Sequence, residues 1–128
     1  MGRSVAGVLL RDGKAFVARR GPGGAMGSRW EFPGGKVEEG ESDQEALARE
    51  FLEEFEAGVR ALRLLGETSF LHHGRERILA AWLVELLPGE RLVPNEHVEL
   101  RWMKGEELRA LDFADSDRKL LGFVEGLL

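Results

Sequence analysis

Two apolar runs separated by a short polar turn open the chain. Val5–Leu10 is followed by Arg11–Lys14, which contains Asp12-Gly13, and then by Ala15–Ala18. Asp-Gly between two apolar runs favours a two-residue hairpin turn, because both residues tolerate the positive φ angles that such a turn needs. The pattern therefore predicts an antiparallel pair of strands.

Four further stretches are expected to be strands, because each is short, apolar and bounded by turn residues. Pro33-Gly34-Gly35 is expected to end the first of them, and His72-His73-Gly74 to join the second to the third. Gly21–Ser28 lacks the spacing of a phosphate-binding loop and is expected to be a surface loop. The four strands are Trp30–Phe32, Leu62–Leu71, Arg77–Leu86 and Glu99–Met103.

The apolar spacing changes to a helical period between Ser42 and Phe55. Phe51 and Phe55 are four residues apart and share one face of a helix with the apolar residues before them. Ser42 with Glu45 three residues later is typical of a capping box at a helix start. Gly58 is expected to end this helix.

Two more helices are predicted near the end of the chain, over Glu106–Leu111 and Ser116–Leu128. Strands and helices are mixed without regular alternation, which predicts an α+β fold with a mixed sheet. The length of 128 residues fits one domain, spanning residues 1–128.

Composition and charge narrow the classes of function. The absence of cysteine excludes a disulfide scaffold, a thiolate metal site and a cysteine nucleophile. The net charge is 18 − 23 = −5, which argues against binding duplex nucleic acid through a basic surface. No apolar run approaches the roughly 18 residues of a membrane span, and no signal-peptide pattern opens the chain. We therefore expect a cytoplasmic protein without membrane attachment, either a monomer or a homodimer.

One face of the helix predicted over residues 42–55 carries a cluster of carboxylates. At 100° per residue, Glu50, Glu53 and Glu54 lie within about 100° of one another. Like charges at this spacing repel in water, and Arg49 alone cannot neutralise three of them. Clustered carboxylate oxygens are suitable ligands for Mg²⁺ or Mn²⁺. The alternative for an isolated segment of this kind is a solvated acidic face.

The context of these carboxylates resembles the signature of the Nudix hydrolases, Gx5Ex7REUxEExGU, where U is aliphatic or bulky and apolar. Gly35 opens the motif, Glu41 follows after five residues, and Arg49–Glu54 follow after seven more. Similarity outside the motif, in SVAGVLLRDGKAFVARR, WEFPGGKVEEGE, WLVE, RWM and ADSDRKLL, resembles the MutT-type branch. The resemblance therefore covers nearly the whole chain.

The resemblance implies a Nudix-type α/β/α sandwich with a mixed sheet and a loop–helix–loop catalytic motif at about residues 35–57. The sequence departs from the signature at its end. Glu56 stands where the signature has glycine, and Ala57 where it has a larger apolar residue. We expect Gly58 to replace the signature glycine at the exit from the helix.

The resemblance also implies a set of metal ligands and supporting groups. In the family, the glutamates of the motif bind divalent cations, usually Mg²⁺, with Mn²⁺ as the other candidate here. Arg49 is expected to orient these glutamates through its forked guanidinium, and Glu41 to support the loop. The expected ligands are Glu50, Glu53, Glu54, the backbone carbonyl of Gly34, and Glu96.

A carboxylate must take a proton from the attacking water, and two positions compete for this role. Glu53 lies in the motif helix, whereas Glu96 lies in the loop before the predicted strand Glu99–Met103. Glu99 is the competitor of Glu96 within that loop region. An ordinary exposed loop carboxylate is the alternative for Glu96.

Nucleotide contacts are expected from residues that match the MutT-type branch in position. Phe32 is expected to stack on a base or to pack in the core, and Asp115 to contact the base edge or to cap the last helix. His72, His73 and His97 are expected to be turn and surface residues rather than metal ligands. The substrate-binding candidates are Arg20, Phe32, Arg75 and Asp115.

The implied activity is hydrolysis of a (deoxy)nucleoside triphosphate to a monophosphate and pyrophosphate. An oxidised guanine nucleotide such as 8-oxo-dGTP is the favoured substrate and a cytosine nucleotide the next. Two alternatives stay open. One is a Nudix hydrolase for another diphosphate, such as ADP-ribose or a dinucleoside polyphosphate, and the other is an inactive nucleotide-binding module.

Overall fold

The first strand organises the sheet. The computed structural model describes residues 2–23 and 27–128, so part of the predicted Gly21–Ser28 loop lies outside the described residues. Strand β1 (Gly2–Arg11) runs parallel to β6 (Arg75–Leu86) and antiparallel to β2 (Lys14–Arg20). It also pairs with β4 (Gly34–Lys36) through Ser4–Ala6. One strand thereby joins the motif loop to the centre of the molecule.

The remaining strands extend the sheet on both sides. β5 (Val59–His72) pairs antiparallel with β6, and β3 (Trp30–Glu31) with β2, which gives the order β3-β2-β1-β6-β5. β7 (His97–Met103) pairs with β2 as a branch from this order. Parallel and antiparallel pairs are both present, so the predicted mixed sheet is confirmed.

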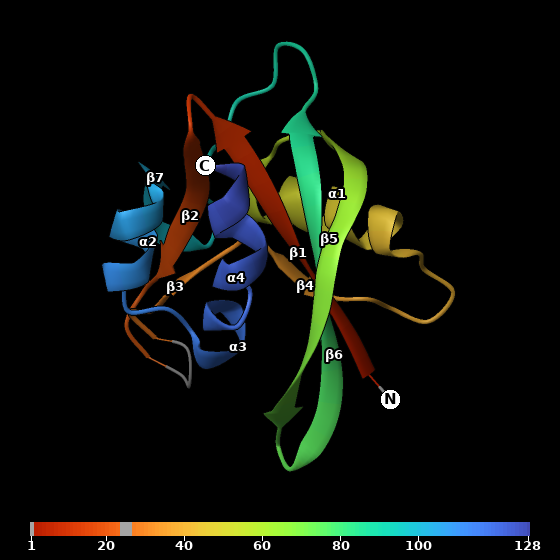
Figure 1. Ribbon diagram of the computed structural model, residues 1–128. Helices are drawn as coiled ribbons and strands as arrows, with labels where there is room; N and C mark the ends of the chain where they lie inside the picture. The colour runs from red at the N-terminus through yellow and green to blue at the C-terminus, as the bar shows by residue number, and fades with distance from the viewer. Residues whose placement is uncertain (1, 24–26) are drawn as a thin grey trace.

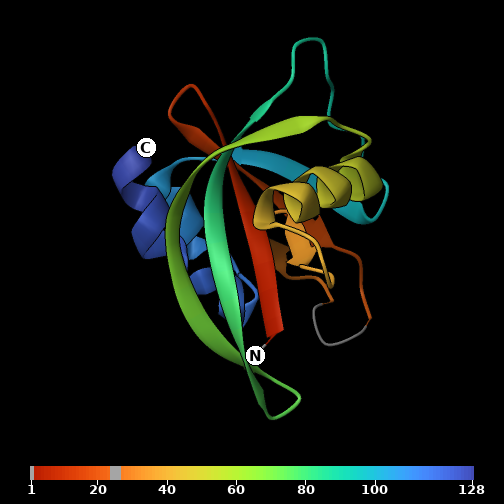
Figure 2. The same cartoon turned by 90° about the vertical axis from the view of Figure 1, so that its right-hand side faces the viewer.

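Helices cover the two faces of the sheet (Figures 1 and 2). Helix α1 (Asp43–Phe55) lies on one face, and α2 (Gly105–Ala110), α3 (Asp115–Arg118), α4 (Leu121–Val124) and η1 (Glu125–Leu127) lie on the other. Successive side chains of β1 point to opposite faces, so its apolar residues serve two cores. Val5 and Leu9 pack in the core under α1, whereas Ala6 and Val8 pack under the C-terminal helices. The predicted α/β/α sandwich is confirmed.

Helix α1 begins as the sequence predicts but ends differently. The Glu45 backbone N–H donates to Ser42 Oγ at 3.1 Å, and the Ser42 N–H donates to Glu45 Oε1 at 2.9 Å. At the other end, Glu56 adopts a left-handed conformation with φ 53°, and its N–H donates to the Leu52 carbonyl at 3.0 Å. The expectation that Gly58 ends the helix is wrong, because Glu56 itself takes the conformation that usually favours glycine.

Both predicted hairpins are present, with longer strands than expected. Asp12 and Gly13 at one turn, and His73 and Gly74 at the other, have positive φ angles between 51° and 75°. The strand predicted over Trp30–Phe32 ends before Pro33, as expected, but Gly34–Lys36 then forms a further strand, β4, that the sequence did not predict.

The predicted C-terminal helix over Ser116–Leu128 is also wrong. Its place is taken by α3, α4 and η1, and the Leu120 N–H donates to the Asp117 carbonyl three residues earlier. Gly122 and Gly126 weaken helix formation in this segment.

Among the described residues, no helix is long and apolar enough to cross a membrane.

Candidate active site

Arg49 organises the exposed part of the motif. Its Nε and Nη2 donate to the two carboxylate oxygens of Glu41 at 2.8 and 2.9 Å, and its Nη1 donates to Glu50 Oε1 at 2.8 Å. Nη2 also donates to the Lys36 carbonyl at 2.9 Å, and Nη1 lies 3.6 Å from Glu53 Oε2. The bond from Arg49 lowers the pKa of Glu41 to about 2. One guanidinium thus ties the loop before α1 to two glutamates of the helix.

Glu50 lies directly against the glycines of β4. A Cβ atom placed on Gly35 would lie 2.5 Å from Glu50 Cδ, and one on Gly34 would lie 1.9 Å from the Val5 carbonyl oxygen. Both distances are shorter than atoms can approach. The clash at Gly34 is with backbone and requires glycine, whereas a side chain at Gly35 would force the Glu50 carboxylate to move. The backbone of the motif loop therefore comes within contact distance of a carboxylate on α1.

Glu54 differs from its neighbours because it is buried. The residue is 1% exposed, and neither carboxylate oxygen has a hydrogen-bond partner among the described residues. Burial, followed by the nearby carboxylates of Glu50, Glu31 and Glu96, raises the pKa of Glu54 to about 10. A buried carboxyl without partners is costly, and a cation placed beside it would remove that cost.

The loop that follows Pro88 is attached to the last turn of α1. The N–H groups of Val93 and Asn95 donate to the carbonyls of Phe55 and Glu54 at 2.8 and 3.0 Å, and Asn95 Nδ2 donates to the Glu53 carbonyl at 3.1 Å. These bonds satisfy carbonyls that a helix end leaves without partners. They also bring the residues that follow Asn95 next to Glu54.

Sequence reasoning missed the buried contacts of His97 and Glu31. The His97 side chain is 0% exposed, so the expectation that it is a surface residue is wrong. Its Nε2 lies 2.8 Å from Glu31 Oε2 and 3.8 Å from Glu54 Oε1, and its ring stacks on Phe55 with centroids 5.2 Å apart. The signal in the sequence was indirect: His97 begins a strand and Glu31 lies in one, and only the pairing of β2 with β3 and β7 brings them together.

The two candidate bases lie on different sides of Glu54. Glu53 is 56% exposed on α1, with Arg49 near it, and Glu96 is an exposed loop residue whose charge raises the pKa of Glu54. Glu99 points elsewhere, because it pairs with Arg19 at 3.1 Å and with Arg101. The structure thus places Glu53 and Glu96, but not Glu99, beside the acidic cluster.

A small cavity of about 170 Å³ extends from the motif glycines toward α3, and we call it the inner cavity. Asp117 lines it, is 8% exposed and accepts the Phe32 N–H at 2.8 Å. Burial, followed by the charge of Glu31, raises the pKa of Asp117 to about 7. Sequence reasoning could not separate Asp117 from its neighbours, because only the packing of α3 shows which acid is buried. The lining includes Ser4, Arg20, Glu31, Phe32, Gly34, Gly35, Phe70, Ser116 and Asp117.

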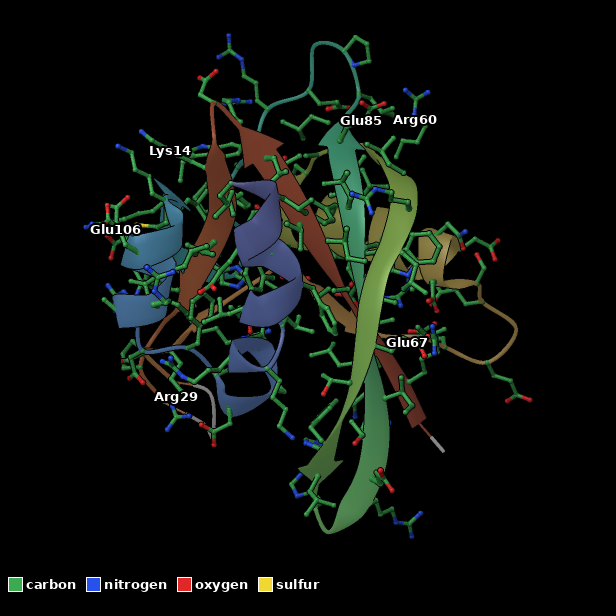
Figure 3. All side chains as sticks on the ribbon, viewed as in Figure 1. Lys14, Arg29, Arg60, Glu67, Glu85 and Glu106 are labelled. Atoms are coloured by element: carbon green, nitrogen blue, oxygen red, sulfur yellow. The ribbon has the colours of Figure 1, made fainter. Side chains whose placement is uncertain are left out.

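A wider cleft of about 470 Å³, the outer cleft, shares Ser4, Phe70 and Ser116 with the inner cavity. Most of its charged side chains are basic. Asp115 lines it but is 95% exposed and pairs with Arg29 at 3.1 Å. Figure 3 shows Arg29 beside α3. The basic members of its lining are Arg29, Lys36, His72, Arg77 and Lys119.

The other predicted substrate residues lie at different depths. Arg20 lines the inner cavity and donates to Glu31 Oε1 at 3.0 Å, whereas Phe32 is 2% exposed and stacks on Phe113 with centroids 5.3 Å apart. Arg75 lies at the start of β6 in a further cleft that shares Lys36, His72 and Arg77 with the outer cleft. Arg20 and Phe32 are thus near the acidic cluster, and Arg75 is at the far end of the basic surface.

These groups are suited to a divalent cation. Glu50, Glu53 and Glu54 gather on one face of α1, and the two Glu54 oxygens have no other partner among the described residues. Carboxylate oxygens are the preferred ligands of Mg²⁺ and Mn²⁺. The chemistry of the donors and the partnerless buried carboxyl both fit such an ion.

Comparison with known proteins agrees with this geometry. The NUDIX domain family matches residues 1–122. The chain is 39% identical over 121 residues to the CTP pyrophosphohydrolase of Escherichia coli K12, covering 91% of this chain and 86% of that protein. It is 30% identical over 116 residues to the 8-oxo-dGTP diphosphatase of the same strain, covering 91% and 89%. The solution structure of the E. coli ORF135 protein is similar with a TM-score of 0.85 and 33% identity, over 99% of this chain and 90% of that one.

The fold, the motif and the relatives lead to one family. The glutamates of the motif lie together on α1, the glycines before it leave room for them, and the similarity extends over nine-tenths of the chain. The chain belongs to the Nudix hydrolase family, in its MutT-like branch.

Proposed function

We propose that the protein hydrolyses nucleoside triphosphates to monophosphates and pyrophosphate with Mg²⁺, and that guanine nucleotides, including 8-oxo-dGTP, are its preferred substrates. The observation that carries the proposal is the buried Glu54 carboxyl, which has no hydrogen-bond partner among the described residues and lies close to Glu31, a residue that lines the inner cavity. Two relatives, an 8-oxo-dGTP diphosphatase and a CTP pyrophosphohydrolase, support nucleotides as the substrate class.

The proposed ligands of the cation are Glu50, Glu53, Glu54, Glu96 and the Gly34 carbonyl. A divalent cation bound there neutralises phosphate oxygens and makes water a stronger nucleophile. Arg49 holds Glu50 and Glu41 in fixed positions, which limits the conformational entropy lost when an ion binds. Glu53 or Glu96 accepts the proton of the attacking water, and both are exposed enough to pass it to solvent.

The inner cavity is the proposed place of the base. An ionised Asp117 only accepts hydrogen bonds, so it suits the N1–H and N2 amino groups of guanine. Arg20 lines the same cavity as a donor, and Phe32 forms an apolar wall. Asp117 is better placed for this role than Asp115, which is exposed and pairs with Arg29.

A cytosine nucleotide is the second candidate substrate. The observation that favours it is the 39% identity to a CTP pyrophosphohydrolase. Because the pKa of Asp117 is about 7, a protonated Asp117 also offers a donor to the N3 acceptor of cytosine.

A nucleotide panel tests the proposal. Pyrophosphate release is measured for 8-oxo-dGTP, dGTP, GTP and CTP, and nucleoside monophosphate release for ADP-ribose and a dinucleoside polyphosphate, which yield no pyrophosphate, with Mg²⁺ or with EDTA. The expected result is pyrophosphate from the triphosphates in Mg²⁺ only, fastest with a guanine base. Turnover of ADP-ribose alone would mean that the protein has the activity of another branch of the family. Nucleotide binding without any turnover would mean that it is an inactive nucleotide-binding module.

A further inference from the structure

His97 and Glu31 belong to no part of the motif, yet both contact the acidic cluster from its buried side. We propose that His97 is a positioning residue for the metal ligand Glu54: by donating a hydrogen bond to Glu31, it anchors that carboxylate and leaves Glu54 available for the cation. The inference rests on the metal site proposed above.

The His97 ring is held in one place and one orientation. Its side chain is 0% exposed, and it stacks on Phe55 at an interplanar angle of 10°. Strand β7 begins at His97, and the bonds of Val93 and Asn95 to the end of α1 fix the loop before it. The ring is therefore attached to the same helix turn that carries Glu54.

The distance between His97 Nε2 and Glu31 Oε2, 2.8 Å, is that of a hydrogen bond. In the proposed arrangement Nε2 carries the proton and donates it to the Glu31 oxygen. The other ring nitrogen, Nδ1, has no partner among the described residues. A ligand role for Nε2 would move the proton to Nδ1 and leave a buried donor unsatisfied, which is costly. The geometry thus favours His97 as a donor to Glu31 over His97 as a metal ligand.

Glu31 is fully occupied, whereas Glu54 is not. Glu31 Oε1 accepts from Arg20 at 3.0 Å and Oε2 accepts from His97. Glu54 Oε1 lies 3.8 Å from His97 Nε2, beyond hydrogen-bond distance. Oxygen and nitrogen atoms of all three residues lie within 4.8 Å of one another. Without the His97 donor, Glu31 would keep only its bond from Arg20, and its Oε2 would be free beside Glu54 to compete for the same cation or to repel the Glu54 carboxylate.

Binding of Mn²⁺, followed by electron paramagnetic resonance, tests the inference on the folded protein. His97→Phe keeps a ring on Phe55 and removes the donor, whereas His97→Gln keeps an N–H that reaches Glu31. We expect His97→Phe to weaken Mn²⁺ binding by roughly tenfold or more, the scale found when partners of metal ligands are removed. His97→Gln should weaken it much less, because the donor is kept. His73→Phe, the same substitution at an exposed turn, is the matched control and leaves the Mn²⁺ affinity unchanged.

Four outcomes would overturn the inference. Mn²⁺ binding of wild-type strength in His97→Phe would show that Glu54 needs no such support, and equal losses in the Phe and Gln variants would assign the effect to packing. If Glu54→Gln also binds Mn²⁺ at full strength, the metal site fails and the inference with it.

Should His97→Phe not fold, the ¹⁵N spectrum of the wild-type imidazole decides. We expect the proton on Nε2 with and without Mg²⁺, and a proton on Nδ1 would overturn the inference.

Discussion

The carboxylates held by Arg49 and those buried beneath them are stabilised in opposite ways. Glu41 and Glu50 accept charge-assisted bonds from one guanidinium, and the pKa of Glu41 falls to about 2. Glu54 and Asp117 lie in the protein interior, and burial raises their pKa values to about 10 and about 7. The first group is held in place by Arg49 without a ligand. The second group is costly to ionise until a cation or a substrate donor reaches it.

The largest expected effect concerns the buried group and its dependence on pH. The pKa of Asp117 is raised above the ordinary value of 3.8, so ionising it in the folded protein costs stability. The cost is absent below about pH 4, grows as the pH rises, and is complete above about pH 7. Asp117→Asn removes it, so we expect the variant to be more stable than wild type at pH 8, by up to roughly 4 kcal/mol, and equal to it at pH 4.

Urea unfolding across this pH range is the measurement. Asp115→Asn is the matched control, because Asp115 is exposed and should leave the pH dependence unchanged. A constant difference between wild type and Asp117→Asn at every pH would show that Asp117 is not the buried titrating group.

The carboxylates around Arg49 are tested through turnover at Glu53, which lies 3.6 Å from Arg49 and is 56% exposed. Glu53→Gln keeps the size of the side chain and removes its charge. Turnover should fall by roughly a hundredfold or more, the scale of lost acid–base or metal catalysis, while the melting temperature stays the same or rises because repulsion within the cluster is relieved. Steady-state kinetics with Mg²⁺ checks this, with the exposed Glu39→Gln as control.

Glu96→Gln shows where the base lies. A loss similar to that of Glu53→Gln places the proton acceptor on the loop, and a small loss places it on α1. An active Glu53→Gln enzyme would mean that this face of α1 is only solvated surface.

The interior half of the sandwich was much harder to predict than the motif. Glu50, Glu53 and Glu54 lie within five residues, so helical periodicity predicted their shared face, and the capping box predicted where α1 begins. The roles of Glu41 and Arg49 followed from the family resemblance. His97, Glu31 and Glu54 come from β7, β3 and α1. No local pattern joins residues that far apart, and burial of a histidine next to a strand end depends on packing. The prediction of one C-terminal helix failed because it gave too little weight to Gly122 and Gly126, which weaken helix formation in a segment that divides into α3, α4 and η1.

The proposed role in base recognition is tested by comparing the buried Asp117 with the exposed Asp115. Asp117→Ala should lower kcat/KM for the preferred nucleotide by about 1–3 kcal/mol, or roughly tenfold to more than a hundredfold, because a polar base edge loses its partner. Poor substrates should be affected much less. The same change at Asp115, which the sequence favoured, is expected to have a small effect on every nucleotide. Selective loss in Asp115→Ala and uniform loss in Asp117→Ala would reverse this assignment.

The smallest expected effect is at the end of α1. Glu56 has a left-handed conformation, φ 53°, at the position where the family signature has glycine. Glycine adopts this conformation without the steric cost of a Cβ atom. Glu56→Gly should raise the free energy of unfolding by roughly 0.5–1 kcal/mol with unchanged kinetics. Chemical denaturation measures the change, and a destabilised variant would show that the Glu56 side chain contributes more than its backbone conformation costs.

Phosphorus NMR of the reaction products in ¹⁸O-enriched water tests the central claim most directly. With Mg²⁺ and dGTP or 8-oxo-dGTP, we expect one monophosphate and one pyrophosphate for each triphosphate, with ¹⁸O in only one of them and no reaction after EDTA. Glu54→Gln should give the same products far more slowly. Release of a nucleoside diphosphate and inorganic phosphate, or turnover that persists in EDTA, would contradict the proposed cation-dependent pyrophosphohydrolase.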